Sequence, residues 1–183
     1  MLELIERTLP YGRGIFDAFT CGHTVSVLRL LHYPPVLRAS NEASIEGEDR
    51  PHQQLGAGAH TDFGAITLLL QDEHPGLEVL DPATNEFVPV DPSPNTFVFN
   101  VGDMLSLWTA GEYKSSVHRV INKARTDRYS AAFFYDGALD CPLTPLGRKR
   151  VDVDGDNATD VITVEKHMLK RIAESYGAGG DSN

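Results

Sequence analysis

Three residues in this chain have the chemistry of metal ligands: His60, Asp62 and, much further along, His118. Two imidazoles and one carboxylate can occupy one face of an octahedral Fe(II) ion and leave three positions open. Arg128 and Ser130 follow, and a guanidinium beside such a metal could hold the far carboxylate of a chelating dicarboxylic acid. Iron, a keto-acid cosubstrate and dioxygen would together make an oxidising enzyme.

The spacing of these residues supports their acting in pairs. Side chains at positions i and i+2 of an extended segment point the same way, so His60 and Asp62 can reach one metal while Thr61 faces away. Arg128 and Ser130 have the same spacing. Their natural joint ligand is a carboxylate, held by a guanidinium fork and a hydroxyl.

Each candidate also has a plainer interpretation. A histidine in a half-buried strand, such as His118, is usually a core residue, and a lone His-x-Asp pattern often arises by chance. Arg128 by itself would be a surface charge, and Ser130 an ordinary strand residue. Two histidines and a carboxylate also describe a hydrolytic zinc site with water in the fourth position. No His-Glu-x-x-His helix supports a zinc protease, and the Arg-x-Ser pattern favours the iron hypothesis.

The elements that must position these residues are predicted to be short strands. Residues 25–33 are rich in β-branched and apolar residues and end at Pro34-Pro35, which predicts a strand. Further short apolar runs, separated by turn residues, cover residues 65–71, 77–80, 87–90, 96–101, 105–108, 115–121 and 129–135. Many short strands at such spacing predict an antiparallel sandwich or barrel.

Other patterns flank these strands. Apolar residues recur at roughly helical spacing over residues 1–20, broken by Pro10 and Gly12, and residues 164–176 have the pattern of a closing helix. Residues 38–54 are polar and predict a surface loop, and residues 177–183 predict a frayed end.

Composition limits the classes of partner. The chain has 183 residues, 41% hydrophobic and 23% charged, with a net charge of −10, which would repel the phosphates of nucleic acid. No apolar run approaches bilayer length, and the N-terminus lacks the basic and apolar regions of a signal peptide. Cys21 and Cys141 are too few for a disulfide framework. We therefore expect a cytoplasmic protein that binds neither nucleic acid nor membrane.

Several stretches of the chain resemble the Fe(II)/2-oxoglutarate-dependent dioxygenases of the isopenicillin N synthase-like superfamily. The stretches that carry the resemblance are Arg-Leu-Leu-His-Tyr-Pro-Pro at 29–35, residues 60–72 beginning His-Thr-Asp-Phe-Gly, Asn-Val-Gly-Asp at 100–103, Lys-Ser-Ser-Val-His-Arg-Val at 114–120, and Arg-Tyr-Ser at 128–130. The resemblance runs from about residue 25 to residue 135, in a specific order and spacing.

The resemblance implies a fold with an all-β core. That core would be a double-stranded β-helix, or cupin-like jelly roll, over about residues 25–150, with helices flanking it at both ends. A single catalytic domain would cover residues 1–183. Family members normally carry a substantial N-terminal region before the segment that resembles residues 1–35, so we expect this chain to be the C-terminal catalytic part, with its active site incompletely enclosed.

The resemblance also implies roles for particular residues. It implies that the iron ligands are His60, Asp62 and His118, and that the cosubstrate is held by Arg128, Ser130 and Tyr33. The cofactors would be Fe(II), 2-oxoglutarate and O2, with ascorbate in support. Family members often carry Asn and Tyr where this chain has Leu31 and His32, so this edge of the pocket has lost polar contacts.

The implied reaction is hydroxylation or desaturation of a small organic molecule, with release of succinate and CO2. Secondary-metabolite, amino-acid and nucleobase substrates stay open, as does assembly into a homo-oligomer. Two alternatives also stay open: an iron-dependent oxidase of the same superfamily that does not use 2-oxoglutarate, and a truncated, inactive metal-binding jelly roll.

Overall fold

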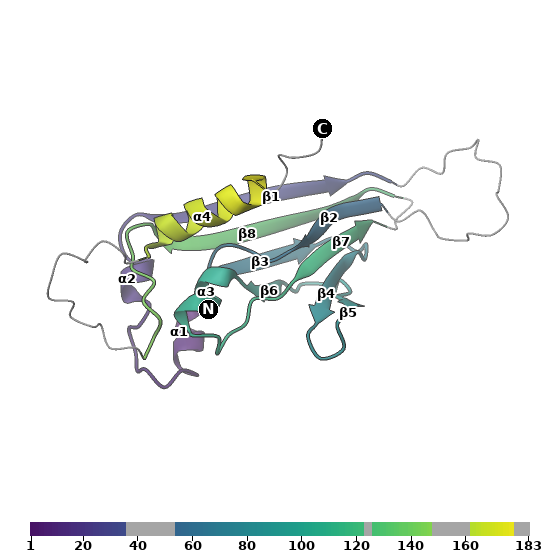
Figure 1. The fold of residues 1–183 in the computed structure, drawn as a ribbon. Coiled ribbons are helices and arrows are strands. Elements are labelled where there is room, and N and C mark those ends of the chain that lie inside the picture. The colour runs from purple at the N-terminus through teal and green to yellow at the C-terminus, as the bar shows by residue number, and fades with distance from the viewer. Residues whose placement is uncertain (36–53, 123–125, 148–161, 178–183) are drawn as a thin grey trace, which may run out of the picture.

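The structure, a computed structural model, describes residues 1–35, 54–122, 126–147 and 162–177. Within these residues the strands form two four-stranded sheets whose neighbouring strands are antiparallel (Figure 1). The first sheet has the order β1 (Thr24–Tyr33), β8 (Arg128–Ala138), β3 (Ile66–Gln71) and β6 (Val98–Val101). The second has the order β2 (Gln54–His60), β7 (His118–Asn122), β4 (Leu77–Asp81) and β5 (Glu86–Pro89). The predicted all-β jelly roll with flanking helices is confirmed, whereas the single domain over residues 1–183 stays a prediction.

Strand register brings the candidate residues together. His60 on β2 lies opposite His118 on β7, and Tyr33 on β1 lies opposite Arg128 on β8. Residues directly opposite each other in an antiparallel pair place their side chains on the same face of the sheet. The pairing of strands far apart in sequence therefore assembles both halves of the predicted site.

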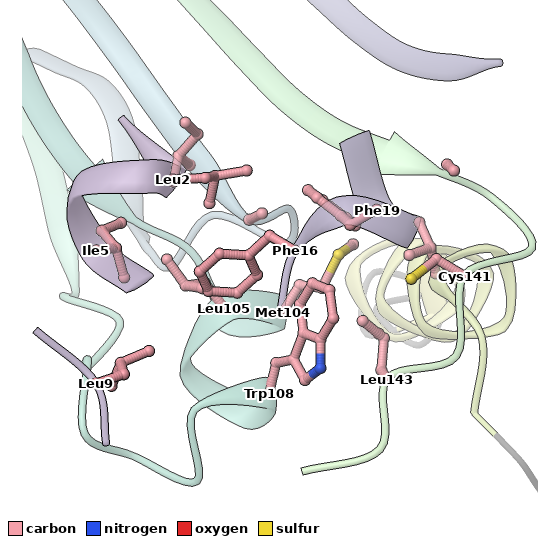
Figure 2. Close-up of a cluster of buried hydrophobic side chains, with 14 residues drawn as sticks. Leu2, Ile5, Leu9, Phe16, Phe19, Met104, Leu105, Trp108, Cys141 and Leu143 are labelled. Carbon is pink, nitrogen blue, oxygen red and sulfur yellow. The ribbon is translucent and has the colours of Figure 1, made fainter. Parts of the chain in front are cut away.

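A hydrophobic core at one end of the sheets anchors the helices. It joins α1 (Leu2–Glu6), α2 (Asp17–Thr20) and α3 (Asp103–Trp108) to the start of α4 (Val164–Gly177). Trp108 lies at its centre, where the rings of Phe16 and Phe19 meet it edge-on at 5.1 and 5.3 Å (Figure 2). Met104 and Leu105 are fully buried beside them. This packing fixes α3, whose first two residues donate from their backbone N–H groups to the carbonyl oxygens of Asp62 and Gly64 in the metal-site loop, residues 61–65.

Two predicted elements differ from the structure. Residues 105–108 were expected to form a strand but belong to helix α3, because Met104, Leu105 and Trp108 are buried together at helical spacing. A short apolar run cannot be assigned to strand or helix by its length alone. The helical pattern over residues 1–20 gives only the short helices α1 and α2, separated by the segment that contains Pro10 and Gly12.

Other boundaries shift by a few residues. The closing helix predicted at 164–176 is confirmed as α4, whereas the strand predicted to start at residue 115 begins at His118. Gln54, expected to end a loop, instead begins β2, and the rest of that predicted loop lies outside the described residues. The predicted frayed end also lies outside them, apart from Gly177, which ends α4. Among the described residues no helix is both long and apolar enough to cross a membrane.

Candidate metal and carboxylate site

The three predicted metal ligands lie together between the two sheets. One ligand atom from each of His60, Asp62 and His118 lies within 4.8 Å of the others. The Nε2 atoms of His60 and His118 are 3.9 and 3.7 Å from Asp62 Oδ1. Asp62 is buried, His118 is mostly buried, and the His60 side chain is 45% exposed. The cluster is thus open to solvent on the His60 side.

Backbone carbonyls orient both imidazoles. The Nδ1 of His60 lies 2.6 Å from the Gly58 carbonyl oxygen, and the Nδ1 of His118 lies 3.0 Å from that of Ser116. A carbonyl oxygen can only accept, so the Nδ1 of each ring carries a proton, and Nε2 is the ring nitrogen that faces Asp62. This is the arrangement found in metal-binding histidines.

The carboxylate of Asp62 is oriented in a comparable way. Its Oδ2 accepts hydrogen bonds from Thr67 Oγ1 at 2.6 Å and Asn100 Nδ2 at 2.7 Å. Thr67 on β3 lies opposite Asn100 on β6, so one strand pair supplies both donors. With Oδ2 occupied, Oδ1 is the oxygen directed toward the two imidazoles. The geometry suits a carboxylate that binds a metal through one oxygen.

Helices α3 and α4 hold the loop that carries Asp62. Thr61 donates from Oγ1 to Asp103 Oδ2 at 2.9 Å, and Arg171 forms a 2.8 Å ion pair with the same carboxylate. His167 Nε2 lies 2.9 Å from the Phe63 carbonyl oxygen. Burial lowers the pKa of His167, which favours the neutral ring as the donor of this hydrogen bond. The loop is therefore held from the side facing away from the metal cluster.

Close packing also requires glycine at two positions around this loop. A Cβ on Gly102, at the start of α3, would lie 2.1 Å from the carbonyl oxygen of Gly64. A Cβ on Gly64 would lie 1.8 Å from Asp136 Oδ1. Burial, and then the nearby charge of Asp62, raise the pKa of Asp136 to about 6. The carboxylates of Asp62 and Asp136 repel each other, and a cation bound to Asp62 would relieve that repulsion.

Arg128 is fully buried on the face of the first sheet that also carries Tyr33 and Thr67. Its Nε donates to the His74 carbonyl oxygen at 3.1 Å, one terminal nitrogen donates to Gln71 Oε1 at 2.9 Å, and the guanidinium lies 4.9 Å from the Tyr33 ring centroid. The other terminal nitrogen, Nη1, is buried without a hydrogen-bond partner. Among the described residues, no carboxylate pairs with this guanidinium. An unpaired buried charge is costly, so the site is suited to an anion.

Tyr33 and Ser130 share a cavity with Arg128 and the metal cluster. This cavity has a volume of about 290 Å³. Tyr33 is buried, and its ring packs so closely on Gly56 that a Cβ there would lie 2.6 Å from it. Leu31, the position noted for its lost polar contact, also lines the cavity. The structure thus brings all six predicted site residues into one cavity, and their roles stay predictions.

The residues present fit the groups that the sequence pattern implies. Two imidazole nitrogens and one carboxylate oxygen suit Fe(II) with open positions. The unpartnered Nη1 of Arg128 suits the distal carboxylate of a dicarboxylic acid, and most other cavity walls are apolar. The arrangement can hold a divalent metal beside a dicarboxylate in a site that partly excludes water.

Sequence reasoning missed several residues that shape this site. Thr67 and Asn100 lie inside stretches already singled out, but their hydrogen bonds to Asp62 depend on the β3–β6 pairing. The contact of Arg171 with Asp103 joins a closing helix to a distant loop, and no local pattern indicates it. For Thr67 and Asn100, the available signal was a polar residue on an otherwise apolar strand.

Comparisons with known proteins agree with this geometry. The model of the 2OG-Fe(II) oxygenase superfamily matches residues 24–137. The chain is 51% identical to the 2-oxoglutarate-dependent dioxygenase citB of Monascus ruber over 96% of this chain and 50% of that protein. It is 48% identical to the clavatol oxidase claD of Penicillium crustosum, over 96% and 49%.

A solved structure leads to the same family. A full-length Neurospora crassa protein in complex with alpha-KG superposes with a TM-score of 0.67 at 33% identity, over 87% of this chain and 47% of that one. The chain spans about half the length of the curated relatives it matches. On the family model, the relatives and the shared fold, the chain belongs to the 2OG-Fe(II) oxygenase superfamily.

Proposed function

We propose that this chain is the catalytic part of an Fe(II)- and 2-oxoglutarate-dependent oxygenase that hydroxylates or desaturates a small organic molecule. One observation carries the proposal: the fully buried Arg128, with one guanidinium nitrogen unpartnered, shares a cavity with the His60, Asp62 and His118 cluster. A metal site alone would fit many proteins. A metal site beside an unsatisfied buried cation fits a chelating dicarboxylate.

In this proposal the residues have separate roles. His60, Asp62 and His118 would hold Fe(II), which with 2-oxoglutarate and O2 supplies an oxidant strong enough for C–H bonds, and succinate and CO2 are released. The carbonyls of Gly58 and Ser116 contact the imidazole Nδ1 atoms, which leaves the Nε2 atoms directed toward Asp62, where they would hold the ion. The protein therefore contributes a preset geometry, which lowers the cost of ordering the ligands.

The cosubstrate end of the cavity is also preset. Arg128 is already oriented by His74 and Gln71, so its free Nη1 can donate to the C5 carboxylate without reorganisation. Ser130 lies two residues along β8 on the same face and would add its hydroxyl as a second donor. Tyr33 packs against the guanidinium and shields it from water.

The alternatives fit these features less well. An iron oxidase that does not use 2-oxoglutarate would leave Arg128 without a counter-ion. An inactive remnant would have no need for the hydrogen bonds that orient each metal ligand. A zinc hydrolase needs a general base, yet among the described residues that line the cavity Asp62 is the sole carboxylate.

We propose further that the protein acts in the cytoplasm on a small-molecule substrate, and that a homo-oligomer is compatible with its surface. The net charge of −10 disfavours nucleic acid as a partner. Both cysteines are free, which suits a reducing compartment. The outer face of the first sheet exposes apolar side chains that a second copy could cover, namely Leu28, Leu30, Leu70, Tyr129 and Phe133.

The test is succinate formation from 2-oxoglutarate in the presence of Fe(II), ascorbate, O2 and a panel of candidate substrates. The wild-type chain should form succinate, and His118→Ala should abolish it. His23→Ala, which replaces an exposed histidine outside the cavity, is the matched control and should leave it unchanged. The hydrolase would instead be supported if metal analysis found zinc and if conversion of a substrate in the panel continued without O2.

A further inference from the structure

A second arginine, Arg29, lines the cavity and is not used by the proposed cosubstrate site. It lies on the inner face of β1, two positions before Leu31 and four before Tyr33, and all three line the cavity. Unlike Arg128 it is exposed. Among the described residues it forms no ion pair, so its guanidinium is available to a ligand.

The register of β1 and β8 separates Arg29 from the cosubstrate. Arg128 lies opposite Tyr33, whereas Arg29 lies opposite Ala132. Four residues of extended strand separate the two backbone positions by roughly 13 Å along the sheet, because each residue advances about 3.3 Å. This backbone separation exceeds the length of one 2-oxoglutarate whose distal carboxylate is held by Arg128. Arg29 is therefore placed to meet a second molecule.

The surroundings of Arg29 indicate the chemistry of that molecule. Its guanidinium carbon lies 5.8 Å from the centroid of the Phe134 ring, which also lines the cavity. Neighbouring walls are formed by apolar side chains such as Leu69 and Val98. A cation beside an aromatic ring and apolar walls suits a flat apolar molecule that carries a negative charge.

The charge balance of the cavity points the same way. Its lining contains two arginines, Arg29 and Arg128, and one carboxylate, Asp62. In the proposed complex Asp62 is engaged by the metal, and the distal carboxylate of the cosubstrate neutralises Arg128. Arg29 then remains the uncompensated charge, in a chain whose net charge is −10. Arg29 therefore attracts an anion locally, although the protein as a whole is negatively charged.

We propose that Arg29 and Phe134 form the primary-substrate subsite, and that the substrate is a small aromatic acid whose carboxylate is held by Arg29. The inference rests on the proposed function, because it takes Arg128 and the metal cluster as occupied by cosubstrate and iron. It names a substrate class and a residue that selects it.

The test measures binding of matched acids and esters to protein with Fe(II) and 2-oxoglutarate under anaerobic conditions. The probes are benzoate, 4-methylbenzoate and 2-naphthoate, each with its uncharged methyl ester, and calorimetry gives each Kd. Wild-type protein should prefer at least one acid over its ester by about tenfold, as expected for a hydrogen bond to a charged group. Arg29→Gln should remove this preference, and Arg29→Lys should retain part of it.

Arg13→Gln is the matched control, because Arg13 is exposed on the N-terminal segment and does not line the cavity. This control should keep the wild-type preference. An unchanged acid preference in Arg29→Gln, or no preference for any acid in the wild type, would overturn the inference. Calorimetry of Fe(II) and 2-oxoglutarate alone tests the proposed function separately. If the wild-type protein does not bind Fe(II) and 2-oxoglutarate, the oxygenase is refuted. An acid preference that still depends on Arg29 would, in that case, support the anion subsite alone.

Discussion

The two hydrogen bonds to Asp62 Oδ2 should set the affinity for Fe(II). Thr67 and Asn100 donate to this oxygen at 2.6 and 2.7 Å, in a position where Asp62 is only 7% exposed. Removing one donor leaves a buried carboxylate free to turn and to lose its single-oxygen geometry. Loss of a partner behind a metal ligand typically weakens metal binding by about 10- to 100-fold. Thr67→Val and Asn100→Leu should each weaken Fe(II) binding within that range.

The two changes should not act independently, because both donors serve the same oxygen. The change in Fe(II)-binding free energy of the double variant should therefore differ from the sum of the changes in the two single variants. Anaerobic competition titration with a coloured chelator measures each Kd. Thr96→Val is the control, since its hydroxyl donates to the Ser93 carbonyl at 2.8 Å, outside the cavity. Wild-type affinity in both single variants would refute the idea that these bonds position Asp62.

Three further changes test other parts of the site. Arg128→Lys should weaken 2-oxoglutarate binding at least about tenfold in calorimetry with little change in Fe(II) affinity, because an ammonium cannot reproduce the oriented guanidinium. Because burial raises the pKa of Asp136 from 3.8 to about 6, its stabilising contribution is lost as pH rises through that value. Asp136→Asn should therefore stabilise metal-free protein at pH 8 by up to about 3 kcal/mol in thermal or denaturant unfolding, and the gain should vanish below about pH 4. Arg171→Leu should weaken Fe(II) binding several-fold by releasing the metal-site loop, whereas Lys170→Leu, at an exposed neighbour, should leave the titration unchanged.

Much of the fold could be predicted because its strands carry local signals. Strand β1 ends just before Pro34-Pro35, as the proline pair predicts. At the start of β8, Arg128 and Ser130 are buried and Tyr129 between them is exposed, as their spacing predicts. Helix α3 was mistaken for a strand because the four residues Leu-Ser-Leu-Trp at 105–108 are too short a run to separate a strand pattern from a helix pattern. Its helical form depends on packing against Phe16 and Phe19, which are distant in sequence.

The predicted site residues were found through motif and spacing, but the contacts that orient them were not. His74 meets Arg128 through a backbone carbonyl, which any residue type would supply, so its identity carries no signal. Arg29 lies in a stretch that was singled out, yet its availability follows only from the β1–β8 register and the cavity lining. Such information belongs to tertiary structure and cannot be read from local spacing.

The most direct test is an anaerobic titration of the Fe(II)-loaded protein with 2-oxoglutarate, followed by the visible charge-transfer absorption of the iron–keto-acid complex. A band that saturates at one cosubstrate per protein is predicted for the wild type. His118→Ala should show no band, and Arg128→Lys should need at least about tenfold more 2-oxoglutarate to reach half saturation. An absent band in the wild type, or an undiminished band in His118→Ala, would contradict the assignment of this cavity as an iron and 2-oxoglutarate site.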